Sequence, residues 1–203
     1  MYDKLTIISN TFVRDFFDQA ASTWDARGKA DDSVLNAIVA AANPPQNARI
    51  LDVACGTGIM FAPLLKRSPA LLRAIDLSPK MVSLAKAKYQ NHPAVKVSVQ
   101  NFYTFNETGF DLIMVYNAYP HFMDKAQFAA QICKCLAPGG RFVIAHGIGK
   151  QKINTRHSGK KVQPISTSLL SCKEEAKRLG DAFLFDIMLD CEHMYILSGH
   201  IKP

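Results

Sequence analysis

Residues 51–59 read LDVACGTGI, an apolar run that passes directly into a glycine-rich turn. The run begins at Arg49, and its aliphatic and β-branched residues are typical of a buried strand. Gly56 and Gly58 allow the backbone to turn sharply and let a ligand approach the main chain closely. A strand that ends in such a turn and opens a helix predicts a nucleoside-containing ligand at the carboxyl end of that strand.

Short apolar runs alternate with helical patterns on either side of this motif. The runs expected to form strands are residues 49–54, 71–77, 95–100, 110–116, 141–145, 183–189 and 194–201. The segments expected to form helices are residues 34–42, 78–88, 128–136 and 171–180. Ser78 and Ser171 have the character of N-caps for two of these helices. Strands that alternate with helices predict a parallel sheet covered on both faces.

The last two runs break this pattern, because only residues 190–193 separate them. A parallel crossover needs about a dozen residues or more, so these two strands are expected to form an antiparallel hairpin. The predicted fold class is therefore α/β, with a doubly wound, Rossmann-like, seven-stranded sheet. We expect that sheet to be mostly parallel, with an antiparallel last strand and helices on both faces.

The length of 203 residues favours a single domain. Its expected parts are an N-terminal helical cap at 1–45, a cofactor-binding core at 46–150, and a lid segment with the closing hairpin at 151–203. Five scattered cysteines form no disulfide or metal-binding pattern, which favours reduced thiols in a cytoplasmic protein. No apolar run approaches the roughly 20 residues of a membrane helix, so no membrane insertion is expected.

The net charge of +7 raises the question of a nucleic-acid partner. The basic residues form no long run, and their densest stretch, residues 150–161, carries no aromatic side chain for base stacking. A solvated basic loop or helix is the simpler interpretation. We therefore do not expect a nucleic-acid partner, and an RNA or other anionic surface is the alternative.

Two kinds of ligand suit the glycine-rich turn, a nicotinamide dinucleotide and an aminoacyl nucleoside. The dinucleotide fingerprint G-x-G-x-x-G requires a third glycine where this chain has Phe61. Asp52 would repel a pyrophosphate and would attract the α-amino group of a methionine moiety. Asp76, 20 residues after Gly56, is placed to accept both hydroxyls of a ribose. Charge therefore favours the aminoacyl nucleoside over a dinucleotide and its dehydrogenase chemistry.

Four motifs occur in order along the chain: residues 51–58 (LDVACGTG), 74–81 (AIDLSPKM), 110–113 (FDLI) and 136–142 (LAPGGRF). Together they resemble the motifs of the class I S-adenosylmethionine-dependent methyltransferases. The pattern is similar to that of small-molecule members of the family, including the quinone-biosynthesis methyltransferases. The resemblance implies S-adenosylmethionine as the methyl donor and S-adenosylhomocysteine as the product, and no metal is expected.

The resemblance also implies roles for residues of the donor site. The acidic residue and the glycines of the first motif would hold the methionine part, Asp76 the ribose, and Leu77 or Met81 the adenine. Asn101 stands where relatives often carry an acidic residue; its carbonyl can accept the same hydrogen bond, or it belongs to a plain turn. The complete expected donor set is Asp52, Ala54, Gly56, Thr57, Gly58, Asp76, Leu77, Met81, Asn101, Phe102 and Tyr116.

The methyl acceptor is expected beyond the carboxyl ends of the strands. His121 follows the fourth strand and His146 follows the fifth, and each is either the group that takes up the acceptor's proton or a structural histidine. If residues 149–157 form a helix, that helix can fold over the cavity as a lid carrying His157. The complete expected catalytic set is His121, His146, Asn117, Tyr116 and His157. Three converging histidines would also permit a metal ion, which is the less favoured alternative.

The N-terminal cap carries the aromatic residues Phe12, Phe16, Phe17 and Trp24. In relatives such a segment covers the donor and shapes the acceptor site; simple packing on the sheet is the alternative. The expected function is methyl transfer from S-adenosylmethionine to a small-molecule acceptor by a monomer or homodimer. Methylation of RNA or protein and a non-catalytic S-adenosylmethionine-binding module are the alternatives, and the acceptor atom stays open.

Overall fold

The computed structural model of the protein describes residues 4–27, 31–160 and 162–203. Residues 1–3, 28–30 and 161, which belong to the expected cap and lid segments, lie outside the described residues. The described residues form a seven-stranded sheet in the order β3-β2-β1-β4-β5-β7-β6. Its strands are β1 (Arg49–Val53), β2 (Leu71–Asp76), β3 (Val95–Val99), β4 (Phe110–Tyr116), β5 (Leu136–His146), β6 (Phe183–Asp190) and β7 (Tyr195–Ile201).

The central strand β1 pairs in parallel with β2 and β4, and β3 and β5 continue the parallel arrangement outward. The strand β7 runs antiparallel to both β5 and β6. The predicted doubly wound sheet with an antiparallel last strand is therefore confirmed. β5 is longer than the predicted strand, because Leu136 already pairs with Phe110 beyond an irregularity in the ladder.

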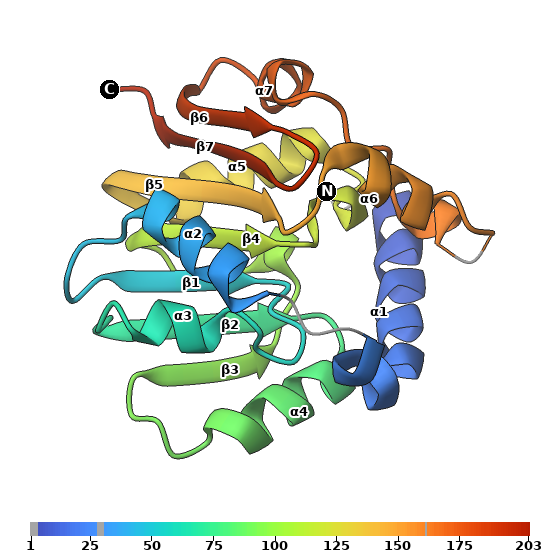
Figure 1. The fold of residues 1–203 in the computed structure, drawn as a ribbon, viewed down its shortest axis with the longest axis horizontal. Helices are drawn as coiled ribbons and strands as arrows, with labels where there is room; N and C mark the ends of the chain where they lie inside the picture. The colour runs from blue at the N-terminus through green and yellow to red at the C-terminus, as the bar shows by residue number, and fades with distance from the viewer. Residues whose placement is uncertain (1–3, 28–30, 161) are drawn as a thin grey trace.

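Helices cover both faces of the sheet, as predicted. Those on one face are α2 (Asp32–Ala42), α3 (Phe61–Leu65) and α4 (Pro79–Tyr89), and those on the other are α5 (Lys125–Cys135) and α7 (Cys172–Leu179). Figure 1 shows α2 and α3 in front of the sheet and α5 behind it. Along β4, Leu112 and Met114 pack in the core beneath α2 and α3. Ile113 and Val115 pack in the core on the opposite face, with α5 and α7. Successive side chains point to opposite faces, so a strand buried on both faces is apolar throughout.

Capping residues set where these helices begin. Ser78 accepts a hydrogen bond from the Met81 N–H and so starts α4, as predicted. Ser171 and Glu174 form the predicted capping box of α7. The helix α5 begins earlier than predicted, because the Asp124 side chain caps it by accepting from the Gln127 N–H at 2.8 Å.

The helix α1 (Lys4–Trp24) packs on neither face but crosses the carboxyl ends of the parallel strands beside α6 (Lys150–His157) (Figure 1). Asp18 of α1 accepts hydrogen bonds from the Ser78 hydroxyl and, at 3.1 Å, from the Lys80 N–H. These bonds fix the middle of α1 at the start of α4. The short 3₁₀ helices are η1 (Asp25–Arg27), η2 (Phe102–Thr104), η3 (Tyr119–His121) and η4 (Gln163–Ile165).

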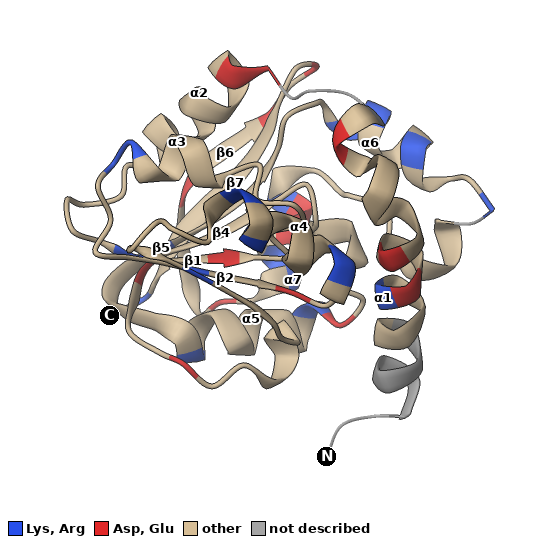
Figure 2. Cartoon of the chain, turned by 90° about the horizontal axis from the view of Figure 1, so that it is seen from below, with Lys and Arg blue, Asp and Glu red and all other residues tan. Residues whose placement is uncertain are grey.

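The surface carries its charges in a dispersed arrangement. Figure 2 shows lysine and arginine positions spread over several helices and loops, including α6. Among the described residues, no helix combines the length and the apolar character that a membrane span requires. The proposed division into cap, core and lid stays a prediction.

Candidate active site

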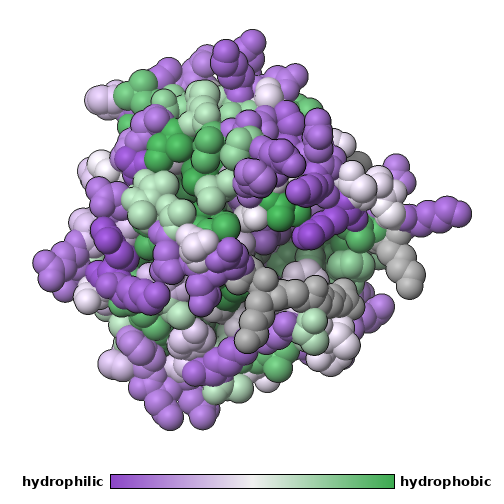
Figure 3. Space-filling model, viewed as in Figure 1, coloured by the Kyte–Doolittle hydropathy of each residue, from purple (hydrophilic) through white to green (hydrophobic). Residues whose placement is uncertain are grey.

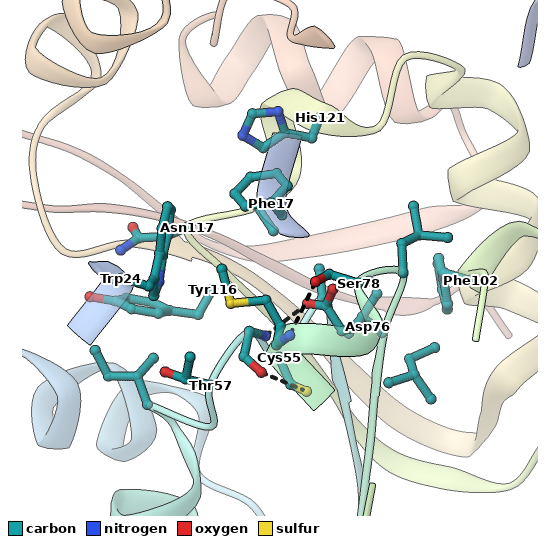
Figure 4. Close-up of a pocket in the computed structure, with 18 of the residues that line it drawn as sticks. Phe17, Trp24, Cys55, Thr57, Asp76, Ser78, Phe102, Tyr116, Asn117 and His121 are labelled. Carbon is teal, nitrogen blue, oxygen red and sulfur yellow. Dashed lines mark hydrogen bonds between the residues drawn. The ribbon is translucent and has the colours of Figure 1, made fainter. Parts of the chain in front are cut away.

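A cavity of about 450 Å³ lies at the carboxyl ends of β1, β2 and β4, with α1 as one wall. Small-molecule sites commonly have volumes of about 300–1,000 Å³. Figure 3 shows apolar side chains in a recess near the edge where α1 meets the strand ends. Figure 4 shows that Asp76 and Ser78 lie on one side of the cavity, with Trp24 and Tyr116 on another. The cavity therefore has the size of a small-molecule site and lies beyond the carboxyl ends of the strands, where the sequence predicts the ligand.

The glycine-rich turn forms part of the cavity floor. Ala54, Gly56 and Gly58 all adopt left-handed backbone conformations, with φ of 55°, 54° and 87°. A Cβ on Gly56 would meet no protein atom within 4 Å, so this residue borders open space. A Cβ on Gly58 would come within 3.0 Å of the Phe61 ring, and Gly58 does not line the cavity. Gly56 thus leaves room for a ligand, whereas Gly58 permits the packing of α3.

Asp76 ends β2 and lines the cavity floor. Its Oδ2 accepts the Gly56 N–H and its Oδ1 accepts the Ser78 N–H, both at 2.8 Å. Burial raises the pKa of Asp76 to about 6, although these two backbone hydrogen bonds act in the opposite direction. Each carboxylate oxygen keeps a second acceptor site. The carboxylate can therefore accept one hydrogen bond at each oxygen from two adjacent hydroxyls.

Asp52 lies deeper, behind the cavity wall, and only 1% of it is exposed. Its Oδ2 has no hydrogen-bond partner among the described residues. Burial, assisted by the charge of Asp76, raises the pKa of Asp52 well above its ordinary value. A buried carboxyl oxygen without a partner is costly, so this end of the site suits an additional hydrogen-bond donor.

Three side chains and one carbonyl connect η1 to the glycine-rich turn. The Thr57 hydroxyl donates to Asp25 Oδ1 at 2.6 Å, and Lys88 Nζ donates to Asp25 Oδ2 at 2.6 Å. Lys88 Nζ also donates to the Thr57 carbonyl at 3.1 Å. We call Asp25, Thr57 and Lys88 the Asp25 clamp. The Thr57 hydroxyl is thus engaged by the protein itself, although Thr57 lines the cavity as predicted.

The residues expected around adenine lie at the β2–β3 side of the cavity. Leu77, Met81, Asn101 and Phe102 all line it, and Met81 and Phe102 are buried. Asn101 Oδ1 accepts the Tyr103 N–H at 3.0 Å and so caps η2. The amide oxygen therefore serves the turn and keeps one further acceptor site. Both interpretations of Asn101 are compatible with this geometry.

His121 of η3 lines another part of the cavity, next to Phe17 of α1 (Figure 4). Its ring centroid is 5.1 Å from that of Phe17, which in turn is 5.4 Å from Trp24. His121 Nδ1 lies 2.9 Å from the Ile165 carbonyl oxygen. A carbonyl only accepts, so Nδ1 carries the hydrogen and Nε2 keeps the lone pair. Burial lowers the pKa of His121 to about 4, although the hydrogen bond acts in the opposite direction. The ring is therefore neutral at pH 7.

The other predicted catalytic residues are placed differently from one another. Tyr116 and Asn117 line the cavity, and Asn117 Oδ1 accepts the Gly147 N–H at 3.3 Å. The His157 ring centroid is 5.0 Å from that of His121, but His157 is not part of the lining. His146 is 2% exposed and lies outside the lining, with its ring 6.0 Å from Tyr195.

Two of the three histidines thus meet, and the third, His146 at the end of β5, is buried outside the cavity lining. The parts of the chain that the structure describes contain no group of three or more histidine, cysteine, aspartate or glutamate side chains placed to hold a metal ion.

Comparison with known proteins relates the sequence and the fold of this chain to methyltransferases. Residues 51–144 match the family model described as a methyltransferase domain. The O-methyltransferase cnsE of Penicillium expansum is 29% identical over 148 residues, which cover 70% of this chain and 54% of that protein. The ubiquinone/menaquinone biosynthesis C-methyltransferase UbiE of Geotalea daltonii is 27% identical over 188 residues, covering 85% of this chain and 80% of that protein.

Residues 51–144 carry the methyltransferase domain, and the relatives and the fold support a class I S-adenosylmethionine-dependent methyltransferase. A solved structure of the same fold is magnesium protoporphyrin IX methyltransferase from Synechocystis with bound S-adenosylhomocysteine. It is 19% identical, covers 93% of this chain and 98% of its own, and has a TM-score of 0.65. The chain spans 54% to 61% of the length of several curated relatives that it matches.

The methyltransferase site contains functional residues that the sequence did not reveal. Asp25 and Lys88 meet across 63 positions of the chain, so no local pattern indicates their pairing. Gly147 permits the approach of Tyr116, because a Cβ on Gly147 would lie 2.5 Å from the Tyr116 hydroxyl. For the approach of Tyr116, the available signal in the sequence was Gly147, a glycine two residues after the predicted strand 141–145.

We expect S-adenosylhomocysteine to bind this methyltransferase more weakly as the pH falls below about 6. Ribose hydroxyls donate to an ionised carboxylate, whereas the pKa of ligand-free Asp76 is about 6. The raised pKa means that ligand must displace a proton below pH 6, so the Kd rises by up to about tenfold per pH unit there and stays level above. Calorimetric titrations at pH 5, 6, 7 and 8 measure this, and equal Kd values at pH 5 and pH 8 would contradict it.

Opening the Asp25 clamp is expected to speed release of S-adenosylhomocysteine. Asp25→Ala removes the bonds of η1 to Thr57 and Lys88, so the dissociation rate should rise about fivefold, as expected when a solvent-screened hydroxyl–carboxylate bond and an exposed ion pair are lost. Stopped-flow displacement measures the rate. Asp186→Ala, which removes an ion pair with Arg141 away from the cavity lining, is the control. Equal rates for both variants would show that the clamp does not retain ligand.

Proposed function

We propose that this protein transfers the methyl group of S-adenosylmethionine to a small-molecule acceptor. The observation that carries the proposal is one cavity lined by both Asp76, free to accept two hydroxyls, and the neutral His121. S-adenosylmethionine, when bound, supplies an activated methyl group on a sulfonium. The protein then needs chiefly to align the acceptor and to take up its proton.

The residues present fit the donor by their chemistry. Asp76 would accept the ribose hydroxyls, and Gly56 would leave space for the ligand at the turn. The unpartnered Oδ2 of Asp52, which lies behind the cavity wall, would reach the α-amino group through water. Leu77, Met81 and Phe102 would pack against adenine. The aromatic residues of α1 that line the cavity, Phe17 and Trp24, would favour the positive sulfonium by cation–π attraction.

On the acceptor side, His121 would act as the general base through Nε2. Tyr116 and Asn117 would orient the acceptor or donor, since both line the cavity between the turn and His121. His157 would act through its contact with His121. His146 is buried at the end of β5 and does not line the cavity, so a supporting structural role suits it better than contact with the acceptor.

A small acceptor is favoured because the cavity is lined largely by apolar and aromatic side chains beneath α1. Relatives named for small molecules, such as the UbiE protein of Geotalea daltonii and a 2-methyl-6-phytyl-1,4-hydroquinone methyltransferase of Synechocystis, support the same proposal. We propose no nucleic-acid partner, because the basic positions in Figure 2 are dispersed rather than gathered at the cavity.

The test has two stages. Calorimetric titration with S-adenosylhomocysteine should give a micromolar Kd, and absence of binding would refute donor use. Formation of S-adenosylhomocysteine from S-adenosylmethionine is then measured with a panel of phenols, quinols, thiols and amines, followed by RNA. Turnover of a small nucleophile that His121→Gln reduces by about a hundredfold or more supports the proposal. Turnover of RNA alone would reject the small-molecule acceptor, and tight binding without any turnover would favour a binding module.

A further inference from the structure

Between β5 and α7, the described residues 150–160 and 162–171 include a stretch that contacts η3, the short helix after β4. The Thr167 N–H donates to the Pro120 carbonyl at 2.8 Å, which joins the two backbones directly. The same segment contacts the His121 side chain, because the Ile165 carbonyl accepts the Nδ1 hydrogen of His121. The segment is therefore hydrogen-bonded both to the main chain of η3 and to the ring of His121, the proposed general base.

Asn154 of α6 fastens this segment from the other side. Its Nδ2 donates to the Leu169 carbonyl at 2.9 Å, and its Oδ1 accepts the Leu169 N–H at 2.8 Å. A primary amide carries both a donor and an acceptor, so the Asn154 side chain can pair with the N–H and the C=O of one residue, as the backbone of a neighbouring β-strand does. Leu169 is 2% exposed, so its polar backbone depends on this partner. We call this two-bond contact the Asn154 latch.

The latch matters because a neutral histidine has two tautomers. Without a fixed acceptor at Nδ1, the hydrogen can sit on either nitrogen, and the form with the hydrogen on Nε2 cannot take a proton there. The Ile165 carbonyl removes that choice, provided that the segment holds it in place. The position of a backbone carbonyl outside η3 thus decides whether His121 can act as a base toward the cavity.

We propose that the described residues 150–160 and 162–171 form a positioning element for His121, with Asn154 as the positioning residue that keeps the ring in its base-competent tautomer. This inference rests on the proposed methyl transfer. In that reaction the acceptor's proton passes to His121 Nε2 while the acceptor's electron pair forms the bond to the methyl carbon. The carbon–sulfur bond breaks and its electron pair stays on sulfur. The step therefore suits an acceptor that carries a proton on its attacking group.

The surroundings of His121 support a neutral ring. His157 of α6 contacts it edge to face, Lys125 of α5 and His146 of β5 lie near enough to influence its charge, and Phe17 of α1 covers another side. These groups are neutral or positive, so none stabilises an imidazolium. The protonated ring formed during transfer would release its proton readily.

Nitrogen-15 NMR of labelled full-length protein reads the tautomer directly and needs no acceptor. In the wild type, with the signal assigned by its loss in His121→Gln, we expect His121 as the Nδ1–H form in about tenfold excess at pH 7, with or without S-adenosylhomocysteine. Asn154→Ala should bring the two tautomers close to equal. Thr155→Ala is the matched control, because its hydroxyl bonds only to Gln151 within the same helix.

An Nε2–H signal for wild-type His121 would overturn the proposal, whether or not the variants fold. An unchanged tautomer ratio in folded Asn154→Ala would overturn the role of the latch. Asn154→Asp keeps the acceptor for the Leu169 N–H and loses the donor, so it should give an intermediate ratio. Calorimetry with S-adenosylhomocysteine on the same samples separates the two hypotheses, because failure of donor binding refutes the proposed function while leaving the tautomer measurement intact.

Discussion

Asp76→Ala is expected to weaken S-adenosylhomocysteine binding by about a hundredfold or more. The substitution removes two hydrogen bonds between ribose hydroxyls and a carboxylate, and hydrogen bonds to charged groups contribute about 1.5–3 kcal/mol each. A loss of about 3 kcal/mol corresponds to about a hundredfold in Kd. The same carboxylate also accepts the Gly56 and Ser78 N–H groups, so the turn and the start of α4 lose their shared anchor. Isothermal calorimetry at pH 7.5 measures the effect.

The control is Asp111→Ala, which removes a carboxyl that accepts the Arg49 N–H at 2.7 Å but does not line the cavity. This variant should bind S-adenosylhomocysteine within about twofold of the wild type, since it leaves the donor site intact. Thermal unfolding of both variants shows whether the protein is still folded. If folded Asp76→Ala protein binds S-adenosylhomocysteine with wild-type affinity, the donor site does not lie at Asp76.

Glu175→Ala is expected to lower the free energy of unfolding by about 3–5 kcal/mol, the largest stability change that we foresee. Glu175 of α7 has 0% exposure. Its Oε2 accepts the Tyr119 hydroxyl at 2.7 Å, and its Oε1 accepts the Leu170 N–H at 3.0 Å. Removal leaves the buried Tyr119 hydroxyl and the part-buried Leu170 N–H without this acceptor, and opens a cavity between α7 and η3. For a chain of this length the melting temperature should fall by roughly 10 °C.

The neighbouring residue provides a matched control. Glu174 belongs to the same helix but is exposed, where it accepts the Ser171 N–H at 3.0 Å in the capping box. Glu174→Ala should therefore lower the melting temperature much less than Glu175→Ala. Differential scanning calorimetry compares the two variants, and similar decreases would show that the buried network does not carry the expected stability.

The strand pattern was readable from the sequence because burial on both faces imposes its own composition. Residues 110–116 are almost entirely apolar, as a strand that contributes side chains to two cores must be. The short spacing before β7 required the antiparallel hairpin. The start of α5 was missed, because Asp124 acts as a cap through a bond that composition alone does not reveal.

The donor site was predictable to the extent that it is local. Ala54, Gly56 and Thr57 line the cavity because they follow one strand, and Asp76 and Leu77 line it because they end the next. Asp52 lies outside the lining, since it sits inside the strand, before the turn that brings the chain to the cavity. The Asp25 clamp was not predictable, because Lys88 and Thr57 come together only when α4 folds back beside the turn.

The histidines show most clearly what could not be predicted from the sequence. His121 follows β4 and His146 ends β5, but the pleat of β5 places His146 on the same side as Ile144, against Tyr195 and away from the cavity. The sequence by itself determined the sheet, the glycine-rich turn and the acidic residue of the second strand, because periodicity, turn chemistry and charge act over a few residues. Only the tertiary structure decided which histidine faces the cavity and that the Ile165 carbonyl holds its tautomer, because those contacts join residues 44 positions apart.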